Sequence, residues 1–227
     1  MRERVEAERL DPRSAERYDV PPDRPDEEPE RLAVTPTPAP AERFSAERPW
    51  DEATRPQGPA PDAETYTDSG RADGQHLIDV HDHLRQELDQ IRNLVEQVAR
   101  GHLDVGAARS AINTMTMRQN SWTLGTYCES YCRVVTTHHT LEDISMFPRL
   151  RQADPRLAPV IDRLEEEHHV IADVLEGVDA ALVRMVSDSE KGLADVQDAV
   201  DLLTDTLLSH LSYEERELVE PLARIGL

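Results

Sequence analysis

Two pairs of side chains, each a histidine followed four residues later by a glutamate, carry the chemistry that is easiest to read from this sequence. The stretch HHTLED contains His138 and Glu142, and the stretch HLSYEE contains His210 and Glu214. Side chains at positions i and i+4 of a helix lie on one face a single turn apart, so each pair can reach one ion. One such pair alone is common on protein surfaces. Its meaning depends on the elements that position it.

Those elements are four long segments in which apolar residues recur every three or four positions, the pattern of one face of a helix. The first lies between residues 74 and 101, and the second runs up to Phe147, where Pro148 is expected to stop the helix. The third begins at Asp154-Pro155, and the fourth covers roughly 192–222. A shorter helix is expected at about 105–117. The sequence therefore predicts an all-α fold: an up-down-up-down four-helix bundle with an extra short helix between helices one and two.

Each of the four apolar stripes is interrupted by a histidine, and two of the interruptions add a glutamate. The predicted inward-facing polar residues are His81, His138, Glu142, His168, His210 and Glu214. In an up-down-up-down bundle the starts of helices one and three lie beside the ends of helices two and four. All six side chains are therefore expected at one level of the bundle.

Two buried carboxylates without a lysine or arginine on any stripe would be expensive to bury unpaired. One or two divalent cations would neutralise them and organise the histidines. Six nitrogen and oxygen ligands exceed what one tetrahedral zinc uses. Mixed imidazole and carboxylate ligands from four helices suit a pair of iron ions, or less readily manganese, with glutamates able to bridge. We therefore predict a dinuclear metal site.

Other residues border this predicted site. Tyr131 lies on the stripe before His138, where it could hydrogen-bond near a ligand or fill the core. His139 borders the site face, as an extra or alternative ligand or as a flanking residue. Cys128 and Cys132 lie one helical turn apart and suit packed thiols better than a disulfide framework.

Composition divides the chain into two parts. Twelve of the sixteen prolines fall in residues 1–75, which lack a periodic apolar pattern and are predicted to be a disordered, Pro-rich acidic tail. Residues 76–227 are predicted to form one compact domain. The net charge of −21 argues against nucleic acid or an anionic membrane as partner. Because neither a membrane-length apolar run nor a signal peptide is evident, we expect a cytoplasmic protein.

The stretches HDHLRQEL, HHTLEDISMFP, LEEEHHVI and HLSYEERELVEPL together resemble the hemerythrin-like family, also described as HHE cation-binding domains. The resemblance covers residues 76–227. It implies a four-helix bundle with a non-haem di-iron centre that binds oxygen or related small ligands. It carries metal-ligand roles onto His81, His138, Glu142, His168, His210 and Glu214.

One departure from the family pattern concerns the third helix. Oxygen-carrying hemerythrins place a second histidine where this chain has Ala172. The site is therefore expected to lack one ligand, which favours sensing or detoxification of peroxide or nitric oxide over oxygen carriage. Glu215 matches the longer spacing of oxygen carriers, so the choice between Glu214 and Glu215 stays open.

Three functions are compatible with the predicted helical bundle and its buried histidines and glutamates. The first is a di-iron protein that binds O2, peroxide or nitric oxide, with slow peroxide decomposition as a conceivable enzymatic activity. The second is an iron- or redox-sensing module whose bundle is ordered by metal and signals to a protein partner. The third is a metal-free helical scaffold, which would keep its stability after chelation.

Overall fold

A computed structural model describes residues 32–61, 66–100, 127–187 and 189–226, and within these ranges all regular structure is helical. The long helices are α1 (Asp68–Ala99), α3 (Tyr127–Leu141), α5 (Ala158–Ser187) and α6 (Ser189–Ile225). The all-α prediction is confirmed for these residues. The short helix expected at about 105–117 lies outside them, and the up-down-up-down order stays a prediction because the link from α1 to α3 also lies outside.

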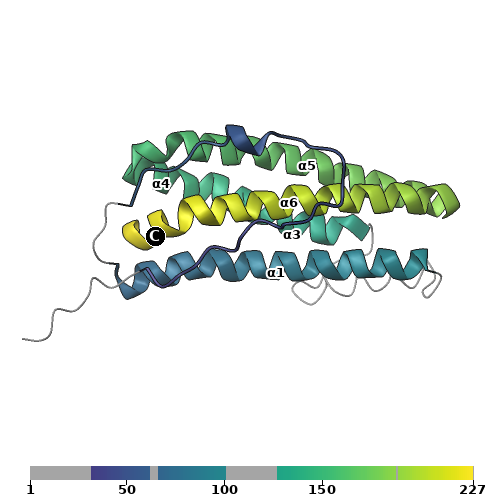
Figure 1. Ribbon diagram of the computed structural model, residues 1–227, viewed down its shortest axis with the longest axis horizontal. Coiled ribbons are helices and arrows are strands. Elements are labelled where there is room, and N and C mark those ends of the chain that lie inside the picture. Colours follow the sequence, from purple (N-terminus) through teal and green to yellow (C-terminus); the bar gives the residue numbers. More distant parts are fainter. Residues whose placement is uncertain (1–31, 62–65, 101–126, 188, 227) are drawn as a thin grey trace, which may run out of the picture.

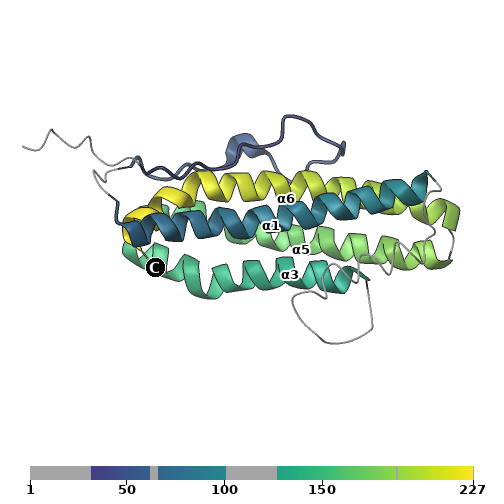
Figure 2. The ribbon, with the colours of Figure 1, turned by 90° about the horizontal axis from the view of Figure 1, so that it is seen from below.

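Helix α6 is the central helix of the arrangement, since it packs along both α1 and α5, while α3 packs against α5 (Figures 1 and 2). The start of α1 lies against the end of α6. A side-chain carbon added at Gly70 would clash with the carbonyl oxygen of Ala223, so this approach requires glycine. Helix α1 begins six residues before Gly74, at Asp68, where the hydroxyl of Thr67 accepts a hydrogen bond from the Gly70 N–H.

Two apolar clusters form the core and lie on either side of a polar layer. One cluster contains Leu84, Leu88 and Leu207, together with Ile171 and Tyr131. The other is built on the residues Ile78, Phe147, Leu150, Ile161, Leu164, Tyr213 and Leu218. The predicted histidines and glutamates fall between these two sets along each helix, so they are buried in the middle of the core.

The second long helix does not stop at Pro148 as expected. It passes through a five-residue π-helical turn, η2 (Glu142–Met146), into α4 (Phe147–Ala153), with Pro148 in the first turn of α4. The Phe147 N–H donates to the Glu142 carbonyl oxygen five residues back. Pro148 has no N–H and would clash with a regular α-helical turn before it, which the wider π turn accommodates.

The third helix begins where the sequence predicted. The Asp154 side chain accepts a hydrogen bond from the Arg156 N–H and opens a short 3-10 turn, η3 (Pro155–Leu157), which leads directly into α5.

Residues 32–61, which we name the N-terminal strap, lie along the bundle (Figure 1). The strap contains the short 3-10 helix η1 (Glu52–Thr54). Its backbone N–H groups donate to three carboxylates of α6: Thr37 to Glu215, Phe44 and Ser45 to Asp205, and Gly58 to Glu217. Residues 1–31 lie outside the described ranges, and the division of the chain at residue 75 stays a prediction.

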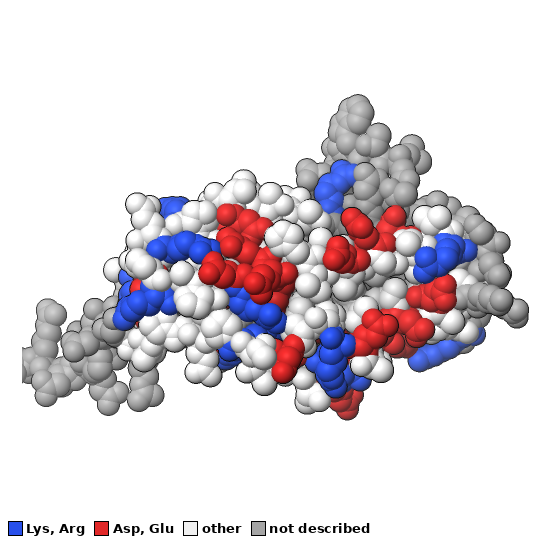
Figure 3. Space-filling model, turned by 90° about the horizontal axis from the view of Figure 1, so that it is seen from above, with Lys and Arg blue, Asp and Glu red and all other residues white. Residues whose placement is uncertain are grey.

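Within the described ranges, no helix combines the length and the apolar character that a membrane span requires. Acidic groups and basic groups are interspersed on the face shown in Figure 3. The described residues on that face form no continuous basic area.

Candidate metal centre

The structure brings all six predicted residues together and adds His139 to them. One group of ligand-type atoms comes from His81, His138, Glu142 and Glu214, and a second comes from His139, His168 and His210. Within each group the atoms lie within 4.8 Å of one another. The four long helices α1, α3, α5 and α6, with η2, all contribute. The prediction that these side chains meet at one level therefore agrees with the geometry, and their role as metal ligands is taken up as a proposal below.

The two carboxylates lie between the two groups. For Glu142, Oε1 is 3.0 Å from Nε2 of His138, and Oε2 is 3.6 Å from Nε2 of His168. For Glu214, Oε2 is 3.5 Å from Nε2 of His81 and 3.6 Å from Nε2 of His210. Each carboxylate thus reaches one histidine of each group, which is the arrangement that bridging ligands need.

Three of the histidines are oriented by a carboxylate on the side facing away from the centre. Nδ1 of His81 lies 2.9 Å from Glu215. Nδ1 of His168 lies 2.8 Å from Asp143, and Nδ1 of His210 lies 3.1 Å from Glu167. A carboxylate accepts the Nδ1–H, so the Nε2 lone pair of each ring points into the centre. Carboxylate-held histidines of this kind are typical of metal ligands.

The open choice between Glu214 and Glu215 is answered by position. Glu214 faces the other ligand-type atoms, whereas Glu215 lies behind His81, forms an ion pair with Arg85 at 2.7 Å and accepts a hydrogen bond from the Thr37 N–H at 2.7 Å. Burial opposes ionisation of Glu215, yet the hydrogen bonds from His81 and Thr37 and the positive charge of Arg85 hold its pKa below the usual value. Glu215 is therefore an ionised partner of His81.

Burial pushes the groups of the centre toward their neutral forms. It raises the pKa of Glu142 well above its usual value, and that of Glu214 to about 8, with the neighbouring carboxyl adding to the effect on Glu142. Burial and the surrounding histidines lower the pKa of His138 to about 2 and that of His210 well below the usual value. The inward-facing atoms of these groups are hydrogen-bond acceptors. Two ionised carboxylates side by side in this centre would repel each other, and so would two protonated histidines.

Several inward-facing atoms have no hydrogen-bond partner among the described residues. They are Nε2 of His139, His168 and His210 and both carboxylate oxygens of Glu142 and Glu214. One shared proton could join the two carboxyls, but no donor is present for the histidine lone pairs. Leaving buried acceptors unpaired costs about 1–3 kcal/mol for each group. Cations between them would satisfy all of these atoms, so the donor set fits metal.

His139, which the sequence analysis placed at the border of the site, belongs to the second group of ligand-type atoms. Its ring stacks on that of His168 with centroids 4.0 Å apart, and its Nε2 joins the group of His168 and His210. The inner face of α3 includes Val135 and His139, which are both buried, whereas Val134 is only partly buried. The expectation that the site lacks one ligand at Ala172 stays a prediction.

Tyr131 does not contact the centre. Its hydroxyl donates to the Leu84 carbonyl oxygen at 3.3 Å, and the ring is buried in the core. The side chains of Cys128 and Cys132 lie outside what the structure describes.

Two residues of the centre's surroundings were missed by the sequence analysis. Glu167 is buried behind His210, and its only sequence signal is its place between Arg163 and His168 on α5. Arg55 pairs with Glu167 at 2.8 Å but belongs to the strap, where no helical period could single it out.

A cavity of about 160 Å³ opens from the surface onto the second group. Its lining includes His139, His168 and Ala172, and the exposed Thr136 and Thr140 lie at its rim. The centre is thus buried on most sides but accessible to a small molecule on this one.

Comparison with known proteins places the chain in a family. The family model for the hemerythrin HHE cation-binding domain matches residues 74–222. Since this match covers well over half of the chain, the protein belongs to the hemerythrin HHE cation-binding domain family. No curated protein and no solved structure matched the chain.

Proposed function

We propose that this protein holds two iron ions in its core and binds O2, peroxide or nitric oxide at them, for sensing or detoxification. The ligands would be two glutamates and five histidines: Glu142, Glu214, His81, His138, His139, His168 and His210. Manganese is the less favoured metal. The proposal takes the four helices to run up-down-up-down, which the contact between the start of α1 and the end of α6 supports.

The observation that carries the proposal is the position of the two carboxylates between the two histidine groups. A single ion could bind to the group of His81, His138, Glu142 and Glu214 alone. It would leave the other group, which consists of three histidines, with unpaired nitrogens. Two ions would leave none of these acceptors unpaired, with Glu142 and Glu214 placed to hold both ions. Mixed nitrogen and oxygen ligands with bridging carboxylates favour iron or manganese over a structural zinc.

The chain's own residues prepare the site for this role. Glu215, Asp143 and Glu167 fix three of the imidazole rings by their Nδ1 atoms. The apolar clusters on either side exclude bulk water. A bound iron pair would supply electron transfer and reversible binding of small ligands, which side chains alone cannot provide.

The cavity limits what could reach the second group. At about 160 Å³ it is smaller than the roughly 300–1,000 Å³ of sites for drug-sized ligands. Diatomic molecules and peroxide fit this volume. Slow decomposition of peroxide is compatible with this access.

The test is the visible spectrum and metal content of protein purified with iron, before and after hydrogen peroxide. We expect oxo-bridged charge-transfer bands in the wild type and their loss in His138→Ala. His76→Ala is the matched control, because His76 is an exposed histidine of α1 and does not line the cavity. Equal spectra for wild type and His138→Ala would contradict the proposal.

The strap favours a second candidate function, an iron- or redox-sensing module that signals to a protein partner. Strap groups contact the outer partners of two of the histidines, so metal occupancy could alter a segment at the surface. A loss of helical circular dichroism on chelation that metal reverses would support this function. An unchanged helical signal would argue against it.

A further inference from the structure

We propose that Arg55 of the N-terminal strap is a positioning residue of the metal centre, so that docking of the strap and binding of metal stabilise each other. This inference rests on the proposed function. It concerns residues outside the ligand set, in a segment that the sequence analysis assigned to the tail.

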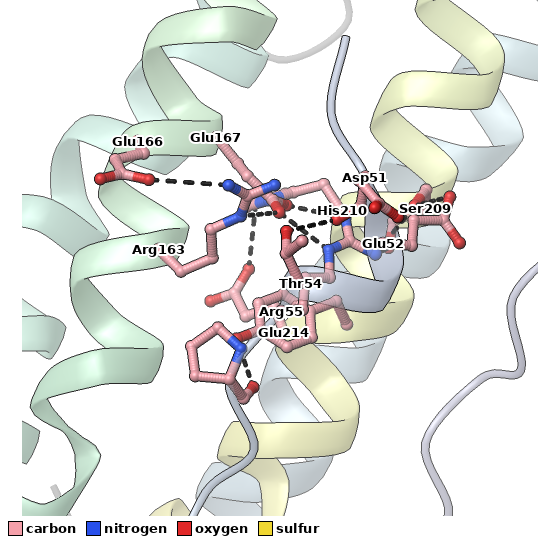
Figure 4. Close-up of polar contacts among 12 residues, drawn as sticks. Asp51, Glu52, Thr54, Arg55, Arg163, Glu166, Glu167, Ser209, His210 and Glu214 are labelled. Carbon is pink, nitrogen blue, oxygen red and sulfur yellow. Dashed lines mark hydrogen bonds and ion pairs between the residues drawn. The ribbon is translucent and has the colours of Figure 1, made fainter. Parts of the chain in front are cut away.

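Arg55 is a buried cation aimed at one carboxylate. Its Nε and Nη2 donate to the two oxygens of Glu167, each at 2.8 Å, and its Nη1 donates to the Ser209 hydroxyl at 2.9 Å (Figure 4). Its guanidinium carbon lies 4.6 Å from the centre of the Tyr213 ring, and the side chain is 5% exposed. A two-pronged pairing of this kind fixes the plane of the carboxylate.

Glu167 passes this orientation to the metal centre. Its Oε2, which accepts from Arg55, also lies 3.1 Å from Nδ1 of His210. Its Oε1 is shared between Arg55 and Nε of Arg163, both at 2.8 Å. Arg55 and Arg163 together hold the carboxylate in the one orientation that directs Nε2 of His210 into the centre.

A second contact of the strap acts on the other side of the centre. The Thr37 N–H donates at 2.7 Å to Oε2 of Glu215, whose Oε1 lies 2.9 Å from Nδ1 of His81. The strap therefore reaches the outer partners of histidines on both α6 and α1. Between these two points it is held to Asp205 by the Phe44 and Ser45 N–H groups.

Coupling between the strap and the metal must be reciprocal. If the docked strap favours the ring orientations that bind metal, then bound metal favours the docked strap by the same factor. Loss of an outer partner of a metal-bound histidine typically weakens metal binding by about 10–100-fold. Because Arg163 still holds Glu167 when Arg55 is removed, we expect the lower end, about tenfold.

The experiment titrates Co2+ into the full-length protein against a competing chelator and records the visible cobalt bands. In Arg55→Ala we expect about tenfold weaker binding and altered bands, because one histidine is no longer oriented. Arg48→Ala is the matched control: Arg48 is also a strap arginine, but its side chain is exposed. Glu167→Gln should change the bands in the same way, and adding Arg55→Ala to it should have little further effect.

The outcomes separate this inference from the proposed function. If the wild type binds no Co2+ or Fe2+, the proposed function is wrong. If the wild type binds but Arg55→Ala has wild-type affinity and wild-type bands, only the positioning role is wrong. Should Arg55→Ala fail to fold, Arg55→Lys decides, because it keeps the charge and loses the two-pronged geometry. Intermediate affinity supports the role, and wild-type affinity with wild-type bands overturns it.

Trypsin gives a second readout that needs no metal spectrum. It should cut the strap between the exposed Arg43 and Phe44 more slowly when Co2+ is bound, because bound metal holds the strap in place. Equal cleavage rates with and without Co2+ would overturn the coupling.

Discussion

Replacing Glu214 with glutamine should stabilise the metal-free protein and remove its stabilisation by metal. Glu214 is fully buried beside Glu142, and in the described part of the chain only histidines lie within ion-pair distance of either carboxyl. Without metal, these two groups oppose folding whenever both are ionised. Glutamine keeps the shape of the side chain and can donate a hydrogen bond to Glu142.

The magnitude follows from the pKa of Glu214. Burial raises it from 4.5 to about 8, so the folded state holds a proton that the unfolded state releases. The stability contributed by this group is complete below pH 4.5 and is lost as the pH rises through about 8. At about 1.4 kcal/mol for each pKa unit, the penalty above pH 8 is on the order of 5 kcal/mol. Burying the glutamine amide costs about 2 kcal/mol in return, which leaves about 3 kcal/mol in favour of the variant.

The assay is urea unfolding of chelator-treated protein at pH 6 and pH 9, followed by circular dichroism. Metal-free Glu214→Gln should exceed the wild type in unfolding free energy at pH 9 and by less at pH 6. Metal at a thousand times its dissociation constant should add about 4 kcal/mol to the wild type and far less to the variant. Glu176→Gln, on the exposed surface of α5, should change neither quantity. A variant that is less stable than the wild type at pH 9, or that gains equally from metal, would refute the reasoning.

Four other substitutions test the fold and the access route. Gly70→Ala should lower the unfolding free energy by about 1–3 kcal/mol, because the added methyl group meets the α6 backbone. Gly177→Ala, with open space around the added methyl group, should raise the unfolding free energy by up to about 1 kcal/mol. Equal effects of the two substitutions in urea unfolding would contradict the close packing at Gly70. Ala172→Leu should narrow the cavity and slow peroxide binding in stopped-flow measurements at unchanged iron content, and an unchanged rate would exclude this route. Asp154→Ala should cost about 1 kcal/mol at pH 7 through loss of the helix cap. Hydrogen bonds from Arg156 hold the Asp154 pKa below 3.8, so this deficit should shrink as the pH falls below that value, and a constant deficit would argue against the ion pair.

The sequence predicted the ligand-bearing helices because burial of one face leaves a period that can be read directly. In α1 the stripe through Ile78, His81 and Leu84 is buried as predicted. In α3 the buried face is shifted by one residue from the predicted line through His138, because Val135 and His139 are the buried residues. The inner face of a helix is wide enough to include both His138 and His139. A pattern that takes one residue every three or four positions includes only one of them.

The π turn and the strap could not be predicted in this way. A regular period assigns Ser145 to the core after Glu142, whereas the π turn buries Phe147, five residues on. The strap is held by backbone N–H groups and by Arg55, and neither produces an apolar pattern. Polar attachment of a proline-rich segment therefore resembles disorder at the level of composition.

The most direct test of the central claim is an anaerobic Fe2+ titration of the metal-free protein, with bound iron measured after removal of the free metal. The account predicts saturation at two iron ions per chain. Because His139 belongs to the second histidine group, His139→Ala should bind the second ion more weakly while the group of His81, His138, Glu142 and Glu214 retains the first. Saturation at one ion in the wild type, or no binding at all, would contradict the account.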